Sequence, residues 1–168
     1  PDRSVQADLR PQLCQAHERG QIVEALQRCA ARCDAGSKAQ AYLLWGDLLR
    51  KASDLRGGDR DLLWEATEKY RASVATAATG AVVYTHWAQA LAALGHIDEA
   101  KVKFEAAIQQ YPRDYLGYFD WAEMLSAPGL ELYPLGDSKR DTKDLAKAAS
   151  LYRQSARYRF DLDWTWMR

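Results

Sequence analysis

A pattern of one tyrosine, one tryptophan, one small residue and one leucine occurs three times in the sequence and restricts its fold more than any other feature. It reads YLLWGDLL at 42–49, YTHWAQAL at 84–91 and YFDWAEML at 118–125, so each copy is Tyr-x2-Trp-small-x2-Leu. Spacings of three and four residues place these side chains on one face of a helix. Self-similar units of this kind predict a stack of repeated helices.

Each copy is followed by a second helical pattern in which a small residue, an aromatic residue and another small residue recur. The three sets are Ala66, Tyr70 and Ser73; Ala100, Phe104 and Ala107; and Ala148, Tyr152 and Ser155. Antiparallel helices pack closely where small residues meet, so we expect facing pairs of small residues within each unit. These pairs are Gly46 with Ala66, Ala88 with Ala100, and Ala122 with Ala148. The aromatic residues then fill the space between one unit and the next.

The middle copy is compact, and the other two carry insertions. In the middle copy Gly95 can end the first helix, and Pro112 ends the second. Relative to it, the first copy has eight more residues between its two small residues and the third has fourteen more. We expect these insertions to form loops near 53–61 and 126–142, since both stretches contain glycine and the second also contains proline.

The pattern resembles the tetratricopeptide repeat family, in which a 34-residue helix–turn–helix carries Trp-x2-Leu-Gly-x2-Tyr, then Ala-x3-Phe, then proline. Residues 81–114 fit it without a gap. The resemblance implies an all-α, right-handed solenoid of antiparallel helical hairpins. We expect three clear repeats within 39–160, a degenerate hairpin in 1–38 and an aromatic tail or cap at 161–168.

The resemblance also implies a binding scaffold, because the first helices of such repeats line a groove for an extended peptide or a helix. The groove positions here are Leu43, Asp47, Thr85, His86, Gln89, Phe119, Asp120 and Glu123. We expect Phe119 to be the apolar anchor and the carboxylates to attract a basic group. The alternative is that these acids form a solvated helix face.

Two further segments are candidates for partner contact. The 126–142 insertion contains Leu130, Leu132 and Tyr133 in a stretch that we expect to be exposed. Trp164 and Trp166 follow the last repeat and either cap the stack or bind a partner. Folding of the insertion back onto the third hairpin is the alternative for that segment.

Residues that carry chemistry form no recognisable catalytic or metal-binding motif. The four thiol and imidazole groups that could meet near Gly20 are Cys14, His17, Cys29 and Cys33, and their spacing is not a familiar zinc signature. We interpret the cysteines as ordinary core or surface thiols. There is no nucleophile elbow, phosphate-binding glycine loop or His-Glu-x2-His motif, so we expect no enzyme activity, metal or cofactor.

Charge and composition exclude several other classes. The chain has 168 residues with 23 basic and 23 acidic side chains, so its net charge does not favour nucleic-acid or anionic-membrane binding. No apolar run is long enough to span a membrane, and the polar N-terminal stretch is not a secretory signal. Three cysteines do not make a disulfide framework, which indicates a reducing intracellular compartment. The chain begins with proline, which indicates a processed chain or part of a longer one.

The sequence therefore predicts a non-catalytic scaffold or adaptor subunit that binds other proteins. The sites expected for this are the groove, the 126–142 loop and the aromatic tail. The alternative is the receptor domain of an organelle import system, reading basic amphipathic presequences with the acidic and apolar groove residues.

Overall fold

The computed structural model describes residues 20–21, 23–28, 31–32, 34–77, 80–126 and 142–166, with the side chains of the last helix described from 143 to 159. The helices are α2 (Ala35–Asp54), α3 (Arg60–Thr76), α4 (Ala81–Ala93), α5 (Ile97–Gln110), α6 (Tyr115–Ser126) and α7 (Thr142–Trp166). Between residues 20 and 32 the described positions are helical as well. The described part of the chain contains no strand, which confirms the all-α class.

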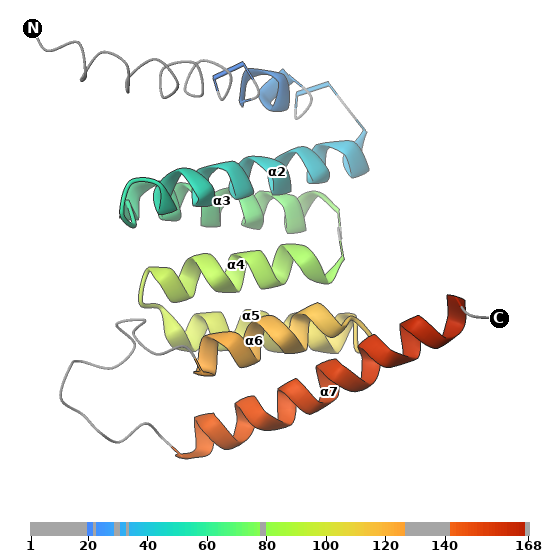
Figure 1. Ribbon diagram of the computed structural model, residues 1–168. Coiled ribbons are helices and arrows are strands. Elements are labelled where there is room, and N and C mark those ends of the chain that lie inside the picture. Colours follow the sequence, from blue (N-terminus) through green and yellow to red (C-terminus); the bar gives the residue numbers. More distant parts are fainter. Residues whose placement is uncertain are drawn as a thin grey trace, which may run out of the picture.

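The helices pack as consecutive pairs, which stack along one direction (Figure 1). Helix α2 packs on α3, α4 on α5, and α6 on α7. The pairs are joined because α4 contacts both α2 and α3, and α6 contacts both α4 and α5. The first helix of each pair therefore lies against both helices of the pair before it.

Local sequence fixes where several helices begin and end. The Asp34 carboxylate accepts hydrogen bonds from the Ser37 amide at 3.1 Å and the Ser37 hydroxyl at 2.8 Å, and so caps the start of α2. Gly95 ends α4 with a φ of +87°, a conformation that glycine adopts without strain. The amides of Gly95 and His96 donate to the carbonyls of Ala92 and Leu91, both at 2.9 Å, which satisfies the last carbonyl groups of the helix.

The insertion of the first copy contains the expected loop, which is confined to residues 55–59 of the predicted 53–61, and most of its other residues are helical. Helix α2 continues eight residues past Gly46, whereas α4 continues only five past Ala88. Helix α3 begins six residues before Ala66, whereas α5 begins three before Ala100. Only residues 55–59 connect α2 to α3, so the insertion lengthens both helices by about one turn.

The small residue of α2 makes room for an aromatic ring of α3. An added Cβ at Gly46 would lie 2.6 Å from Cε1 of Tyr70, and its three nearest neighbours would all be atoms of that ring. Tyr70, one helical turn further along α3 than Ala66, is therefore the group nearest to Gly46.

Two of the three repeated aromatic side chains lie between one helix pair and the next, as the sequence predicted. The ring of Tyr70 on α3 meets His86 of α4 edge-on, with centroids 6.3 Å apart. Phe104 on α5 stacks on Trp121 of α6, with centroids 6.0 Å apart and planes 7° from parallel. Tyr152 on α7 instead contacts Phe119 of its own pair.

Each tryptophan of the repeated pattern is covered by a lysine from the second helix of its pair. Lysine nitrogens lie over the ring centroids at 3.8 Å for Lys69 on Trp45, 3.9 Å for Lys103 on Trp87 and 3.8 Å for Lys147 on Trp121. Cations over indole faces attract the ring electrostatically, and their carbon stems exclude water from it. The repeated pattern does not reveal this contact, because Lys147 precedes its alanine whereas the other two lysines follow theirs by three residues.

The proposed domain limits shift at both ends of the array. Helix α2 begins at Ala35, so residues 35–38 belong to the first helix pair and not to a separate N-terminal hairpin. Helix α7 continues to Trp166, so residues 161–166 extend the last helix rather than form a separate tail. Most of residues 1–34 lie outside the described part of the chain.

Candidate functional site

Three helices that are far apart in sequence line one hollow of about 350 Å³. Its lining residues are Arg50 of α2, Gln89, Ala92 and Ala93 of α4, and Asp120, Glu123 and Met124 of α6. We call this set the three-helix hollow. It lies where the first helices of the three pairs meet, which is the side of the molecule for which the sequence predicted a groove.

Next to the hollow, an Asp47–His86–Tyr70 cluster connects α2, α4 and α3. Oδ1 of Asp47 lies 2.7 Å from Nδ1 of His86 and accepts a hydrogen bond of 2.9 Å from the Tyr70 hydroxyl. Burial opposes ionisation of Asp47, but contacts with His86 and Tyr70 and the nearby charge of Arg50 outweigh it and lower the pKa of Asp47. Asp47 is therefore a stable anion that holds three helices together.

Asp120 faces the opposite electrostatic balance. Burial raises the pKa of its carboxyl, and the negative charges of Asp114 and Glu123 raise it further. His86 and Arg50 act in the other direction without cancelling these effects. Ionised Asp120 is therefore less favourable than an exposed aspartate, and a ligand cation placed beside it would relieve that cost.

The hollow also contains a cation that sequence reasoning missed. Arg50 lines it, and Nε of Arg50 is buried with no hydrogen-bond partner among the described residues. Buried donors without partners are uncommon in folded proteins. Arg50 follows Asp47 by three residues, so helical spacing places the two on the same side of α2. That spacing is the signal that could have identified it.

Leu43 and Thr85 were expected in the groove, and the structure corrects both. Leu43 is 3% exposed and Thr85 is 0% exposed, so neither side chain is available to a ligand. They occupy the same position of the repeated pattern as Phe119, which is 42% exposed. In the second copy the first helix of the next pair covers this position, since an added Cβ at Gly117 of α6 would lie 3.9 Å from Thr85.

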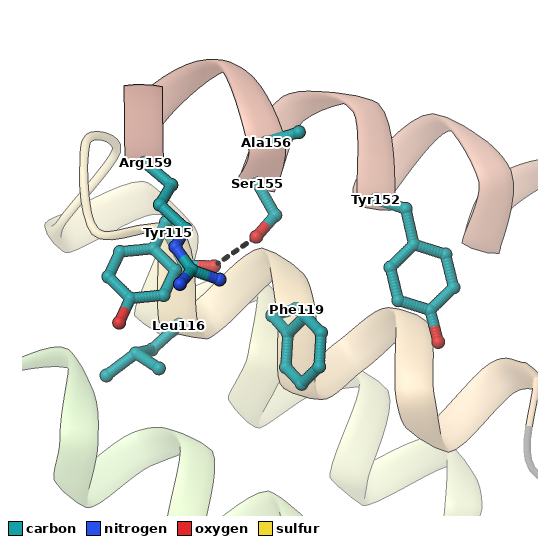
Figure 2. A pocket seen from close by; sticks show the side chains of 7 residues that line it. All are labelled: Tyr115, Leu116, Phe119, Tyr152, Ser155, Ala156 and Arg159. Carbon is teal, nitrogen blue, oxygen red and sulfur yellow. Dashed lines mark hydrogen bonds between the residues drawn. The ribbon is translucent and has the colours of Figure 1, made fainter. Parts of the chain in front are cut away.

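Phe119 lies in a different hollow from the groove acids. It lines a larger groove of about 630 Å³ between α6 and α7 (Figure 2). There its ring meets Tyr152 edge-on at 5.9 Å between centroids. The Tyr152 hydroxyl donates a hydrogen bond to Glu123. Of the groove residues named from sequence, Gln89, Asp120 and Glu123 line the three-helix hollow, and Asp47 and His86 lie beside it.

Several candidates fall outside what the structure describes. These are Leu130, Leu132 and Tyr133 of the insertion, the side chains of Trp164 and Trp166, and the Cys14, His17, Cys29 and Cys33 set. Within the described residues, no group of three or more histidine, cysteine or acidic side chains is arranged to hold a metal ion. In the same part of the chain no helix combines the length and apolar character needed to cross a membrane.

Comparison with known proteins finds no family model that matches the chain, no similar curated protein and no similar solved structure. The function is therefore argued from the geometry of the site.

Proposed function

We propose that this protein is a non-catalytic binding scaffold, built as a tetratricopeptide-like solenoid, whose first helices bind a segment of another protein. The observation that carries the proposal is the three-helix hollow, which takes its lining from α2, α4 and α6. A ligand placed there contacts all three helix pairs at once. Binding sites formed between packed helices are largely preformed, which limits the ordering cost of binding.

The charges of the hollow indicate what the ligand carries. Asp120 and Glu123 favour a basic group, and the positive charge of the Arg50 side chain favours a carbonyl or carboxylate. Ala92, Ala93 and Met124 supply apolar surface between them. A peptide segment with a lysine or arginine beside an exposed backbone carbonyl or an acidic side chain has this combination.

The import-receptor alternative receives less support from this arrangement. Asp47 is already engaged by His86 and Tyr70, and Arg50 adds a positive charge to the hollow. A purely basic presequence would meet that cation. A ligand of mixed charge fits the described residues better.

A filled hollow tests the proposal. Gln89→Trp places an indole in the three-helix hollow, and Gln109→Trp makes the same change on the exposed side of α5. We expect immobilised wild type and Gln109→Trp to capture the same partner proteins, identified by mass spectrometry, and Gln89→Trp to lose them. If all three proteins capture the same set, the ligand does not use this hollow and the proposed function is wrong.

A further inference from the structure

The groove between α6 and α7 is a second surface, separate from the three-helix hollow. Its lining residues are Tyr115, Leu116, Phe119, Tyr152, Ser155, Ala156 and Arg159, and we call it the end groove. Figure 2 shows the side chains from α6 and α7 facing a common space, with the Ser155 hydroxyl bonded to the Tyr115 carbonyl at 3.1 Å. This hydrogen bond fixes the two helices at the open end of the groove.

The repeated pattern identifies what kind of surface the end groove is. Aligning Tyr118 with Tyr84 makes Phe119 equivalent to Thr85, and aligning Tyr152 with Phe104 makes Ser155 equivalent to Ala107. Thr85, Phe104 and Ala107 are all fully buried. They are buried because α6 packs on α4 and α5. The end groove is therefore the face on which, in the earlier pairs, the next helix lies.

The way α6 covers α4 and α5 shows what such a helix must carry. Gly117 approaches closely, since an added Cβ would lie 3.7 Å from atoms of Ala107 and Ile108. Trp121, four residues later on the same face, stacks on Phe104. At the end groove, the exposed and small Ala156 leaves room for a similar close approach, Ser155 is buried against Tyr115, and Tyr152 takes the place of Phe104. A small residue followed four positions later by an aromatic residue fits this surface.

Charge defines the occupant further. Arg153, Arg157 and Arg159 follow one another closely on α7, whereas Lys147 on the same helix already pairs with Glu105 and covers Trp121. Arg159 lines the end groove itself. Arg153 and Arg157 directly follow the lining residues Tyr152 and Ala156, so helical geometry places them about 100° further round α7, toward solvent. This side of the groove attracts carboxylates.

We propose that the end groove binds an acidic amphipathic helix of a partner protein, which packs as a further first helix of the stack. The helix carries the small-x3-aromatic pattern and places an acidic side chain beside Arg159. A second copy of this chain is a poorer occupant. Its comparable helices, α4 and α6, are already packed within the chain, and Leu26 lies beside the outer face of α2 in a hollow with Gln40 and Leu44.

A peptide with the sequence of residues 114–126, DYLGYFDWAEMLS, is the probe. It contains the Gly-x3-Trp pattern and three acids without a basic residue. Labelled with fluorescein at its N-terminus, it is titrated with the folded chain and followed by fluorescence anisotropy. We expect saturable binding that Ala156→Glu and Arg159→Glu each weaken by about tenfold or more. The matched control Ala146→Glu, also exposed on α7 but outside the groove, should change it by less than about threefold.

Circular dichroism establishes that each variant is folded before binding is compared. Equal binding to wild type, Ala156→Glu and Arg159→Glu would overturn the proposal, as would an equal loss with Ala146→Glu. A peptide whose three acids are replaced by lysine should bind more weakly, and equal affinity would contradict the requirement for an acidic helix. Sedimentation equilibrium tests the other occupant, because a wild-type dimer that Ala156→Glu dissociates would assign the groove to a second copy.

Discussion

At the residue scale, the packing of α2 on α3 depends on the absence of a side chain at Gly46. The Tyr70 ring occupies the space that a Cβ would need, and its hydroxyl continues to Asp47 on the same helix as the glycine. Glycine costs a helix interior roughly 0.5–1 kcal/mol relative to alanine. That cost is offset here by the contact of a fully buried aromatic ring with the backbone of α2.

Gly46→Ala should destabilise the protein. Its new Cβ would lie 2.6 Å from the Tyr70 ring, and shifting that buried ring costs about 1–3 kcal/mol, more than the gain in helix propensity. The matched control is Gly117→Ala in α6, whose added Cβ would have no neighbour closer than 3.7 Å. We expect that variant to be neutral or more stable by up to about 1 kcal/mol. Urea unfolding of the two variants measures this, and equal stabilities would contradict the role assigned to Gly46.

The sequence predicted that position 46 must be small, but not what it faces. The repeated sequence pattern showed that a small residue in the first helix and an alanine in the second recur at fixed positions, which indicated close helix packing. Which group fills the contact depends on the rotation of each helix about its axis and on the rotamer of Tyr70. Pattern spacing does not determine either one.

At the element scale, the extra turn at the start of α3 reaches the end of α4 in the next pair. The Arg60 guanidinium donates a hydrogen bond of 3.1 Å to the Leu94 carbonyl at that end. Nearby, Trp64 meets the His96 ring edge-on, with centroids 5.2 Å apart. Cations favour helix C-termini, where carbonyl groups lack partners within the helix. The lengthened helix therefore connects the first pair to the second.

Arg60→Met should weaken this connection while keeping a side chain of similar length. The loss of a charged hydrogen bond at a helix C-terminus is expected to cost about 0.5–1.5 kcal/mol. Arg71→Met is the control on the same helix, because Arg71 is exposed and pairs with Glu68, one turn away, at 2.9 Å. Such exposed pairs contribute about 0.5 kcal/mol or less. Thermal unfolding followed by circular dichroism compares the two, and an equal effect would show that Arg60 does not cap α4.

The end of a helix could be predicted from sequence where a single residue determines it. The lengths of the helices could be predicted less well. Gly95 ends α4 in a left-handed conformation and Pro112 follows α5, as the sequence indicated. The first insertion was expected to be a loop, yet its residues on either side of Gly57 and Gly58 are helix formers. Glycine therefore marked the turn correctly, and the surrounding residues extended the two helices up to it.

At the scale of the whole molecule, one polar cluster connects the first two helix pairs and acts electrostatically on an aspartate of the third. Asp47 joins α2 to α3 and α4, and Asp120 of α6 lies within the electrostatic influence of His86 and Arg50. The sequence predicted that Asp47, His86 and Asp120 belong to one side of the array. Arg50 was not predicted there because it is not a position of the repeated pattern, although its spacing of three residues from Asp47 indicates the same side of α2. Phe119 was placed with them because it aligns with groove positions of the earlier copies. The alignment does not show that, among the described residues, the last helix pair is left uncovered by a further helix.

The two aspartates should have opposite effects on stability. The pKa of Asp47 is lowered from its usual 3.8. Its stabilising contribution to the free energy of unfolding is therefore present above that value and is lost as the pH falls through the folded pKa. The pKa of Asp120 is raised from 3.8. Its stabilising contribution to the free energy of unfolding is therefore fully present below that value and is lost as the pH rises through the folded pKa. At about pH 7, Asp47→Asn should therefore destabilise by about 1–3 kcal/mol, since it weakens hydrogen bonds to a charged group.

Asp120→Asn should instead stabilise the protein at about pH 7, by no more than about 1 kcal/mol because water screens the half-buried carboxylate. Lowering the pH toward 4 protonates Asp120 in the wild type first, since its pKa is the raised one, so the advantage of Asp120→Asn should shrink over this range. The cost of Asp47→Asn should persist until the pH falls below the usual value of 3.8. Urea unfolding of wild type and both variants at several pH values follows these differences. If both substitutions change the free energy of unfolding in the same direction at pH 7, the cluster does not have the charge balance described for it.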